Sequence, residues 1–426
     1  MIGDRGLVDL GALEQHARRV ALVIAGRVIE HHLNADWSDG DEPTRPCVDC
    51  GAQARHAGRR DKRFDSVLGS LCLKRAYYHC ASCNSGFYPR DHALGLNGMS
   101  LTPGLTKMIG HVGALVSFAE GSALLHELAG VLIDAKQVER TAERLGEEIR
   151  DDERRVVTTT APLADTLYLG MDGTGVPVRP AELVGRSGKQ PDGSAKTREV
   201  KLVTVWSAED RDPQGIPMRD RGSISYSAAI ESAATLDTND ELSAFAQRVA
   251  REASRRGFDQ APRQVVLGDG APWIWKLTDE LFPDAIQVVD LFHAKGHLWD
   301  VAKSVYGAGT EVGEQWAKQQ RDALDTGQID AIVKALEGHA AHNDEARKCL
   351  GYIGNNRERM RYPTFREQGL CVSTGVVEAG CKVAIGTRLK RAGMRWTVPG
   401  ADAIIALRCN RLSGRFDDFW DRRAAR

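Results

Sequence analysis

The chain has 426 residues, of which 42% are hydrophobic, enough to bury a core in each of roughly two to four domains. Its 57 basic and 58 acidic side chains leave a net charge of −1, which excludes a uniformly basic, chromatin-like protein. The longest apolar run, residues 20–25, is far shorter than the ~18 residues of a membrane helix, and residues 1–10 lack the apolar stretch of a signal peptide. We therefore expect an intracellular protein with no membrane partner.

The first residues predict a long helix followed by a linker. Apolar residues recur at three- and four-residue spacings across residues 8–33, which is typical of an amphipathic helix. Residues 34–46 are polar, hold two prolines and contain no apolar run, so they favour a linker. We assign residues 1–44 to this N-terminal helix and linker.

Two pairs of cysteines predict a metal site. Cys47 and Cys50 form one C-x2-C pair, and Cys80 and Cys83 form another, with 29 residues between the pairs. A two-residue gap lets a tight turn direct both thiolates at one ion, and four thiolates satisfy tetrahedral zinc. The separation exceeds the ~15–20 residues of the compact pattern, which leaves four buried thiols as the alternative. We expect residues 45–97 to form a zinc ribbon around a structural Zn²⁺.

Residues 98–160 predict a helical region that binds DNA. A break before Asp134 separates two helices, and Asp134 is placed to cap the second of them. The polar face of that second helix carries Lys136, Gln137 and Arg140, as in a helix-turn-helix whose second helix enters the major groove. Helix pairs of this size are common, so a plain packing role is the alternative.

From residue 161 onwards, strands and helices alternate, which predicts an α/β domain in a chain that is multidomain α+β overall. The β-rich runs predict strands over residues 166–171, 201–206, 223–226, 263–268 and 286–289. Helical periodicity predicts helices over residues 238–256, 272–281, 375–389 and 399–412. Residues 291–361 read as helical for some 70 residues, with polar breaks.

Three acidic residues follow or begin these expected elements. Asp172 and Asp269 each come directly after a strand and beside a glycine, and Glu378 lies one turn into a helix. Converging carboxylates hold Mg²⁺, and two such ions clamp the attacking and leaving oxygens of a phosphoryl displacement. Taken singly, each residue also reads as a turn or surface carboxylate, because spacing alone cannot select three of 58 acidic residues.

The segments around these carboxylates resemble one known family. Residues 170–177, 268–275, 289–298 and 373–409 are similar to insertion-sequence transposases of the Kra type, relatives of the mutator-like elements in the DDE group. The run from Gly375 to Trp396 is the most specific of these segments. The resemblance covers most of the chain, because the zinc ribbon and the helical region also fit the family's layout.

What the resemblance implies is a ribonuclease-H-like catalytic domain over residues 161–426, interrupted by an all-helical insertion at about residues 299–372. It assigns the catalytic roles to Asp172, Asp269 and Glu378. These three residues would also hold two Mg²⁺ (or Mn²⁺) ions in each active site.

Asp290 and His293 resemble the Asp/Cys-x2-His motif that mutator-like transposases carry after the second catalytic aspartate. A supporting role near the metals is one interpretation. The other is structural: Asp290 caps the following helix and His293 packs on the sheet.

Basic residues near the C-terminus predict a second contact with DNA. Residues 351–426 hold 15 Lys and Arg against 7 Asp and Glu. Lys382, four residues beyond Glu378 on the same helical face, would contact a DNA phosphate or pair with Glu378. The stripe expected to hold the DNA backbone consists of Arg388, Lys390, Arg391 and Arg395, for which a solvated surface is the alternative.

We therefore expect a bacterial-type DDE transposase, cytoplasmic and nucleoid-associated, that cuts and joins DNA with divalent metal. Its partners would be double-stranded DNA, both terminal inverted repeats and target, and further copies of itself in a dimer or larger assembly. Two other classes stay open: a structure-selective nuclease on the same fold, which never joins ends, and a domesticated zinc-ribbon DNA-binding protein.

Overall fold

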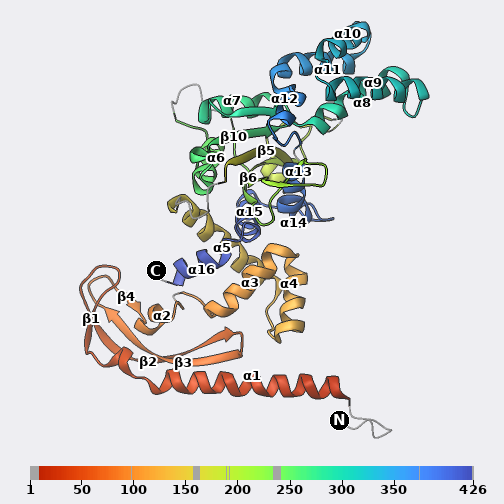
Figure 1. Ribbon diagram of the computed structural model, residues 1–426. Coiled ribbons are helices and arrows are strands. Elements are labelled where there is room, and N and C mark those ends of the chain that lie inside the picture. Colours follow the sequence, from red (N-terminus) through yellow and green to blue (C-terminus); the bar gives the residue numbers. More distant parts are fainter. Residues whose placement is uncertain are drawn as a thin grey trace. The chain divides into compact units, whose positions relative to one another are not determined.

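The computed structural model describes residues 9–96, 98–156, 164–188, 190, 192–233, 241–373 and 375–424 (Figure 1). The chain divides into two compact units, one of Met1–Leu145 with Asp418–Arg426 and the other of Gly146–Asp417. The predicted border at residues 160 and 161 lies outside the described residues. The finer division into four domains stays a prediction.

The first unit contains a four-stranded antiparallel sheet in the order β1-β2-β3-β4. Its strands are β1 (Thr44–Pro46), β2 (Gln53–Ser66), β3 (Gly69–Cys80) and β4 (Ser85–Phe87). The β2–β3 hairpin is long, and its register runs from Ser66 opposite Gly69 to Arg55 opposite His79. This hairpin brings the segment before β2 level with the segment after β3.

Helix α1 (Leu10–Ala35) confirms the predicted N-terminal helix. The C-terminal half of α1 packs on the β2–β3 hairpin. A Cβ on Gly26 of this helix would lie only 3.3 Å from the Leu68 carbonyl oxygen. Glu30 and Asn34 accept hydrogen bonds from the β3 amides of Cys72 and Lys74, at 2.7 and 2.8 Å. Short helices η1 (Ser38–Gly40) and α2 (Pro89–Ala93) flank the sheet.

A small helical cluster follows in the same unit. It consists of α3 (Pro103–Leu115), α4 (Phe118–Leu124), the π-helical turn η2 (Leu125–Ala129) and the start of α5 (Ala135–Arg155). Leu105, Leu125 and Val138 share one apolar core, which joins α3, η2 and α5. Gly113 allows close packing, because a Cβ there would lie 2.6 Å from the Cβ of Ala142.

The second unit is built on a five-stranded mixed sheet in the order β11-β10-β5-β6-β9. The strands are β5 (Thr166–Pro177), β6 (Thr197–Ser207), β9 (Ser225–Ala229), β10 (Arg263–Gly268) and β11 (Ile286–Val289). Strands β5, β6 and β9 pair antiparallel, whereas β10 pairs parallel with both β5 and β11. A separate two-stranded hairpin joins β7 (Asp210–Arg211) to β8 (Pro217–Met218).

Strand β5 is longer than predicted. Its glycines suggested an end at residue 171, but pairing with β6 continues from Leu167 opposite Ser207 to Pro177 opposite Thr197. Gly173 and Gly175 face bulky β6 side chains, since a Cβ on them would approach Glu199 and Thr197 to 2.5 and 2.7 Å. Glycine here makes room across the strand pair rather than ending the strand.

Helices pack against this sheet and bury a large apolar core. They are α6 (Ala244–Arg256), α7 (Pro272–Leu281), α13 (Gly375–Gly380), the π-helical turn η6 (Cys381–Gly386), α14 (Thr387–Leu389) and α15 (Val398–Leu412). Of the predicted helix over residues 238–256, residues 238–240 lie outside the described residues. The short turns η3 (Pro180–Leu183) and η4 (Phe258–Gln260) and the terminal α16 (Phe416–Ala424) complete the list.

In the described residues between β11 and α13 the regular secondary structure is all helical, as predicted, with short loops between the helices. It comprises α8 (Leu291–Tyr306), α9 (Glu311–Asp325), α10 (Ile329–Ala340), α11 (Asp344–Asn356), η5 (Arg357–Met360) and α12 (Tyr362–Glu367). The Leu291 amide donates to the Val372 carbonyl at 2.9 Å, so the segment leaves and rejoins the sheet at one place. Across the described ranges, none of the helices has the length and apolar content to span a bilayer.

Candidate functional site

The four cysteines of the first unit gather at one point, as predicted. Their sulfur atoms all lie within 4.8 Å of one another, with Cys47–Cys83 and Cys50–Cys80 each 3.6 Å apart. Tetrahedral thiolates about 2.3 Å from zinc would lie about 3.8 Å apart, which fits this set. The cysteines are therefore placed to bind a metal ion such as zinc.

The long separation between the two cysteine pairs is the length of the β2–β3 hairpin. The first pair precedes β2 and the second follows β3, so antiparallel pairing brings them together. Hydrogen bonds from the Ser85 hydroxyl and from the Asp49 and Cys50 amides lower the pKa of Cys47 to about 6. This local polarity favours the thiolate of Cys47, which is the form that binds metal. At Cys50 the Ala52 amide acts to lower the pKa, but the neighbouring thiols of Cys83 and Cys80 raise it to about 12.

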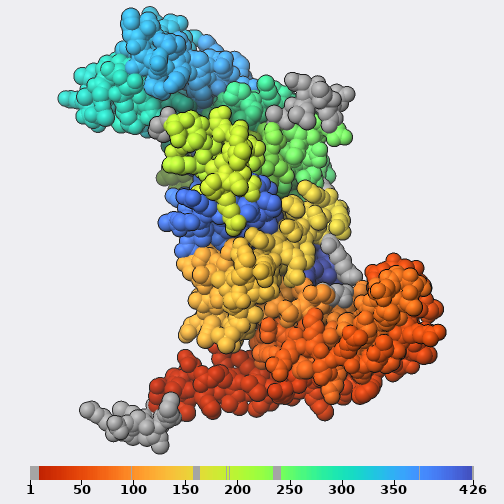
Figure 2. All heavy atoms as spheres, turned by 180° about the vertical axis from the view of Figure 1, so that it is seen from behind, coloured from red at the N-terminus to blue at the C-terminus, as the bar shows by residue number. Residues whose placement is uncertain are grey.

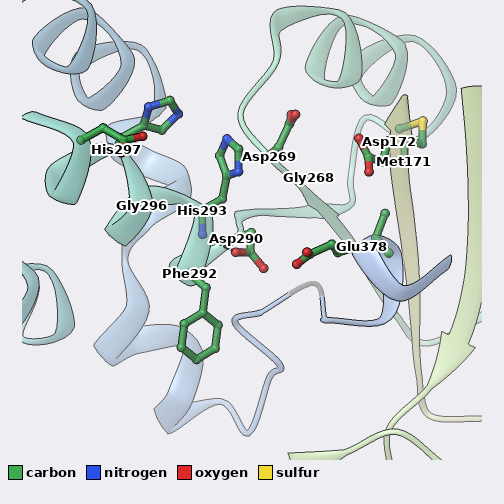
Figure 3. A pocket seen from close by; sticks show the side chains of 12 residues that line it. Met171, Asp172, Gly268, Asp269, Asp290, Phe292, His293, Gly296, His297 and Glu378 are labelled. Atoms are coloured by element: carbon green, nitrogen blue, oxygen red, sulfur yellow. Dashed lines mark hydrogen bonds between the residues drawn. The ribbon is translucent and has the colours of Figure 1, made fainter. Parts of the chain in front are cut away.

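In the second unit, one pocket of about 400 Å³ collects the three predicted carboxylates (Figure 3). Its walls come from β5, the ends of β10 and β11, helix α8 and helix α13. The ionisable side chains that line it are Asp172, Asp269, Asp290, His293, His297, Asp300 and Glu378.

The register of two parallel strands brings Asp172 and Asp269 to the same level. Leu267 on β10 lies opposite Gly170 on β5, so a further two residues along each strand lead to Asp269 and Asp172. Asp172 therefore lies within β5, and the prediction that it follows the strand is wrong, because β5 continues to Pro177. Asp269, by contrast, comes directly after the last residue of β10, as predicted. A backbone amide holds each carboxylate: Gly173 donates to Asp172 at 2.6 Å and Ala271 donates to Asp269 at 2.8 Å.

Glu378 reaches the pocket because α13 packs directly on β5. The contact point is Gly170, where a Cβ would lie 2.1 Å from a methyl carbon of Val377. Residues 170 and 172 point to the same face of the strand, since side chains alternate. Only a glycine at this position lets α13 lie close enough to present Glu378 beside Asp172.

Asp290 has the predicted capping role, and its supporting role near the metals stays a prediction. It caps α8 by accepting a hydrogen bond from the His293 amide at 2.5 Å, and it also lines the pocket. Figure 3 shows its carboxylate pointing toward that of Glu378 across the pocket. His293 is exposed at the pocket wall, so the alternative in which it packs on the sheet is wrong.

The helical segment contributes residues that the sequence analysis missed. His297 lies one turn after His293 on α8, and its ring is 4.9 Å from that of His293 and 4.3 Å from that of Tyr352 on α11. The Tyr352 hydroxyl donates to the Asp269 carbonyl at 2.8 Å. The i, i+4 histidines were a readable signal, whereas nothing in the sequence links Tyr352 to Asp269.

Burial and like charge raise the pKa of Asp172. Burial is the larger cause and the charge of Asp269 adds to it, whereas hydrogen bonds from Cys381 and Gly173 act against them. Burial, and then the proximity of His293, lower the pKa of His297, so its neutral form is favoured. The pocket therefore disfavours the ionised form of Asp172 unless a cation lies near it.

The carboxylates surround a wider space than the cysteines do. Among the described residues, the four cysteines are the group of three or more Cys, His, Asp or Glu residues whose ligand atoms all lie within 4.8 Å of one another. The carboxylates are instead distributed around the pocket wall. Their oxygen donors nevertheless match the ligand preference of Mg²⁺ and Mn²⁺, which favour carboxylates and retained water.

In the first unit, the predicted helix-turn-helix residues lie in the first turns of α5. Asp134 caps that helix by accepting from the Gln137 amide at 2.9 Å, as predicted. Lys136 and Arg140 are exposed and Gln137 is half-buried, and Lys136 pairs with Glu139 at 2.8 Å. Their role in DNA binding stays a prediction.

Of the predicted basic stripe, Lys390, Arg391 and Arg395 are exposed, and so is Lys382. The prediction that Arg388 lies on the same surface is wrong, because its side chain is fully buried. Its guanidinium lies over the ring of Trp396, 5.2 Å from the centroid, and this tryptophan is itself held by a hydrogen bond to the Leu389 carbonyl. The switch to a π-helical turn at Cys381 changes which residues share a face after Glu378.

Comparisons with known proteins add little to this geometry. No family model matches the chain, and no curated protein matches it. A solved structure of the Drosophila P element transposase strand transfer complex is similar over 74% of this chain and 79% of that chain. Its identity is 10% and its TM-score 0.26, values too low to support an argument about function.

Proposed function

We propose that this chain is a DNA transposase of an insertion sequence, of the DDE type that the sequence resembles. The observation that carries the proposal is the gathering of Asp172, Asp269 and Glu378 around one pocket. These residues come from two strands and a helix that are far apart in the sequence. The resemblance to Kra-type transposases points to the same three residues.

The sheet of the second unit supports a ribonuclease-H-like catalytic unit. Its first three strands pair antiparallel, and the last two add parallel on the other side of β5. The order β11-β10-β5-β6-β9 puts the first strand at the centre with its carboxylate level with the end of β10. An all-helical segment between the last strand and α13 corresponds to the expected insertion.

Asp172, Asp269 and Glu378 are the residues that would hold two divalent ions, with Asp290 close by. Bound there, the ions would stabilise the charge on the attacking and leaving oxygens of a phosphodiester. The two aspartates would hold the ions at fixed positions, since backbone amides fix the carboxylates of Asp172 and Asp269 in place. In this scheme no carboxylate acts as a nucleophile. Water would attack a phosphodiester and free a DNA 3′-hydroxyl, which would then attack a phosphodiester of target DNA and release a target 3′-hydroxyl.

DNA would reach this pocket along exposed basic residues. Lys382, Lys390, Arg391 and Arg395 follow Glu378 in sequence and are exposed, so they are candidates for contacts to the phosphate backbone. In the first unit, the exposed Lys136 and Arg140 are candidates for binding the terminal inverted repeats, next to a zinc ribbon that stabilises the module.

The proposal is tested by cleavage and strand transfer on DNA flanking the protein's own gene. We expect wild type with Mg²⁺ to cut and join these ends. Asp269→Asn and Glu378→Gln should lose at least about 10³-fold in cleavage, because each removes a metal ligand. Both variants should still bind the ends with nearly unchanged affinity.

Asp284→Asn, an exposed carboxylate outside the pocket, is the matched control and should cut and join like wild type. Cleavage of branched DNA without joining would replace the proposal with a nuclease. Binding to the ends without cleavage, in wild type and variants alike, would identify a DNA-binding protein with no catalytic role.

A further inference from the structure

A small cavity in the second unit is lined mainly by arginines. Its volume is about 10 Å³, enough for about one water molecule, and it shares no lining residue with the carboxylate pocket. Figure 2 shows the two helices that form it, with the end of α5 in yellow next to α6 in green. Five arginines, one glutamate and one serine make up its wall.

Helical spacing turns these arginines toward one space. Arg150 and Arg154 are four residues apart on α5. Arg248, Arg251 and Arg255 follow one another at spacings of three and four residues on α6. Residues three or four apart lie on the same face of a helix, so each set forms a row. The two rows face each other across the cavity.

Two of the five arginines are committed to neighbouring groups. Arg248 donates to both carboxylate oxygens of Glu231, at 2.8 and 2.7 Å, and to the Ser227 hydroxyl at 3.0 Å. Arg255 pairs with the buried Glu252 at 2.6 Å. These contacts neutralise two of the five positive charges and leave the others without an equivalent partner.

Arg150 and Arg251 lack such carboxylates. In the described part of the chain neither makes a hydrogen bond or an ion pair, and Nε of Arg150 is buried. Glu153, which lines the cavity, pairs with Arg415 instead, at 3.3 Å. Burial, and then the charge of Arg248, lower the pKa of Arg251. Because a guanidinium keeps its proton in proteins, these repelling charges favour an anion between them.

We propose that this cavity binds a phosphate group, with Arg150 and Arg251 as its two main ligands. A guanidinium forms paired, charge-assisted hydrogen bonds to phosphate oxygens. A space for one water molecule encloses one phosphate oxygen, so the other oxygens would stay at the opening. The exposed Arg154, 3.7 Å from Asp151, is a candidate to contact them. Asp402 also interacts with Arg150, but burial raises the pKa of Asp402 and disfavours its charged form.

Two sources of phosphate fit this chemistry: free phosphate and the DNA backbone. The inference is independent of the proposed function, because binding of inorganic phosphate by itself demonstrates the site. With the DNA backbone as the source, the site would add to DNA affinity and would then rest on that function.

Isothermal titration calorimetry of the full chain with inorganic phosphate, at constant ionic strength in chloride, tests the site. Wild type should bind one phosphate with a dissociation constant below about 1 mM. Arg251→Gln should bind it at least about 10-fold more weakly, since hydrogen bonds between charged groups are lost. Arg150→Gln provides a second test on the other helix. The matched control Arg221→Gln removes an exposed arginine outside the cavity and should bind phosphate like wild type.

Thermal unfolding separates a ligand site from an internal ion network. Without phosphate, Arg251→Gln should be at least as stable as wild type, because it removes a cation from among like charges. With about 10 mM phosphate, wild type should gain stability and the variant should gain much less. A variant that is less stable than wild type without phosphate, and that responds to phosphate as wild type does, overturns the inference.

Fluorescence anisotropy with labelled duplex DNA distinguishes the two sources. Weaker DNA binding by Arg251→Gln, but not by Arg221→Gln, assigns the site to the DNA backbone. Unchanged DNA binding together with lost phosphate binding assigns it to free phosphate. Absence of phosphate binding in wild type, with no DNA defect in Arg251→Gln, overturns the inference. A chain that neither binds nor cuts DNA refutes the proposed function, whereas the phosphate titration still decides this site.

Discussion

At the scale of single residues, the position of Glu378 depends on the absence of a side chain at Gly170. A Cβ at this position would lie 2.1 Å from Val377 and 3.1 Å from Trp206. Gly170→Ala must therefore displace α13 and move Glu378 away from Asp172. Because a shift of about 1 Å costs roughly 100-fold in catalysis, we expect a loss of that order in DNA cleavage.

The second substitution Val377→Ala separates this displacement from general damage to the core. It removes the methyl group that the new Cβ would strike, so Gly170→Ala/Val377→Ala should recover most of the cleavage lost in the single variant. Cleavage rates at saturating Mg²⁺, together with thermal unfolding, provide the comparison. Wild-type cleavage by Gly170→Ala would contradict this account of how Glu378 is positioned.

At the scale of elements, a buried carboxylate ties α6 to neighbouring segments of the second unit. Glu252 is fully buried, 2.6 Å from Arg255 and 2.9 Å from Arg415, and Arg415 also pairs with Glu153 on α5 at 3.3 Å. Burial would by itself raise the pKa of Glu252, but Arg415 and Arg255 outweigh it and lower the pKa. We expect Glu252→Gln to destabilise the unit by about 3–5 kcal/mol, because Arg255 loses its carboxylate partner and Arg415 keeps only Glu153.

The pH dependence of that loss follows from the lowered pKa. A carboxyl group whose pKa is lower in the folded state contributes its full stability above its unfolded pKa. That contribution disappears as the pH falls through the folded value, so wild type and Glu252→Gln should converge in acid. Urea unfolding between pH 3 and 8 measures the difference, and the exposed Glu358→Gln should show none. A difference that grows as the pH falls would contradict the prediction.

At the scale of the whole molecule, the division into two units predicts that metal removal has a confined effect. A structural zinc site supplies folding free energy directly, so chelation or Cys80→Ser should unfold β1–β4. The sheet of the second unit should keep its structure, because it is built from Gly146–Asp417 alone. Hydrogen exchange and bound zinc measure both effects.

Cys72→Ser is the matched control, since this half-buried cysteine lies on β3 between the two pairs and is not one of the four gathered thiols. Its zinc content and exchange pattern should match those of wild type. Exchange in β2 and β3 that is unchanged after zinc removal would contradict a structural metal site.

Local patterns in the sequence were sufficient for several elements of the fold. Strands β10 and β11 and helix α7 have the predicted bounds, because each is a short periodic run closed by turn residues. The gathering of the four cysteines was also predicted from a local pattern, because C-x2-C spacing directs two thiolates at one metal ion. The glycines of β5 misled the prediction, because their role is to accommodate side chains of β6.

The sequence by itself determined many of the helices and strands and the residues able to do chemistry: four thiols in two pairs, and carboxylates on or just after strands and on a helix. Only the tertiary structure decided which of these residues meet. It put Asp290 and His297 at the pocket and the Tyr352 hydroxyl on the Asp269 carbonyl, buried Arg388 against Trp396, and left one face of α1 exposed. The physical reason is that periodicity and turn chemistry act between near neighbours in the chain. The burial of a side chain and the gathering of residues at one site depend instead on packing between segments that are distant in the sequence.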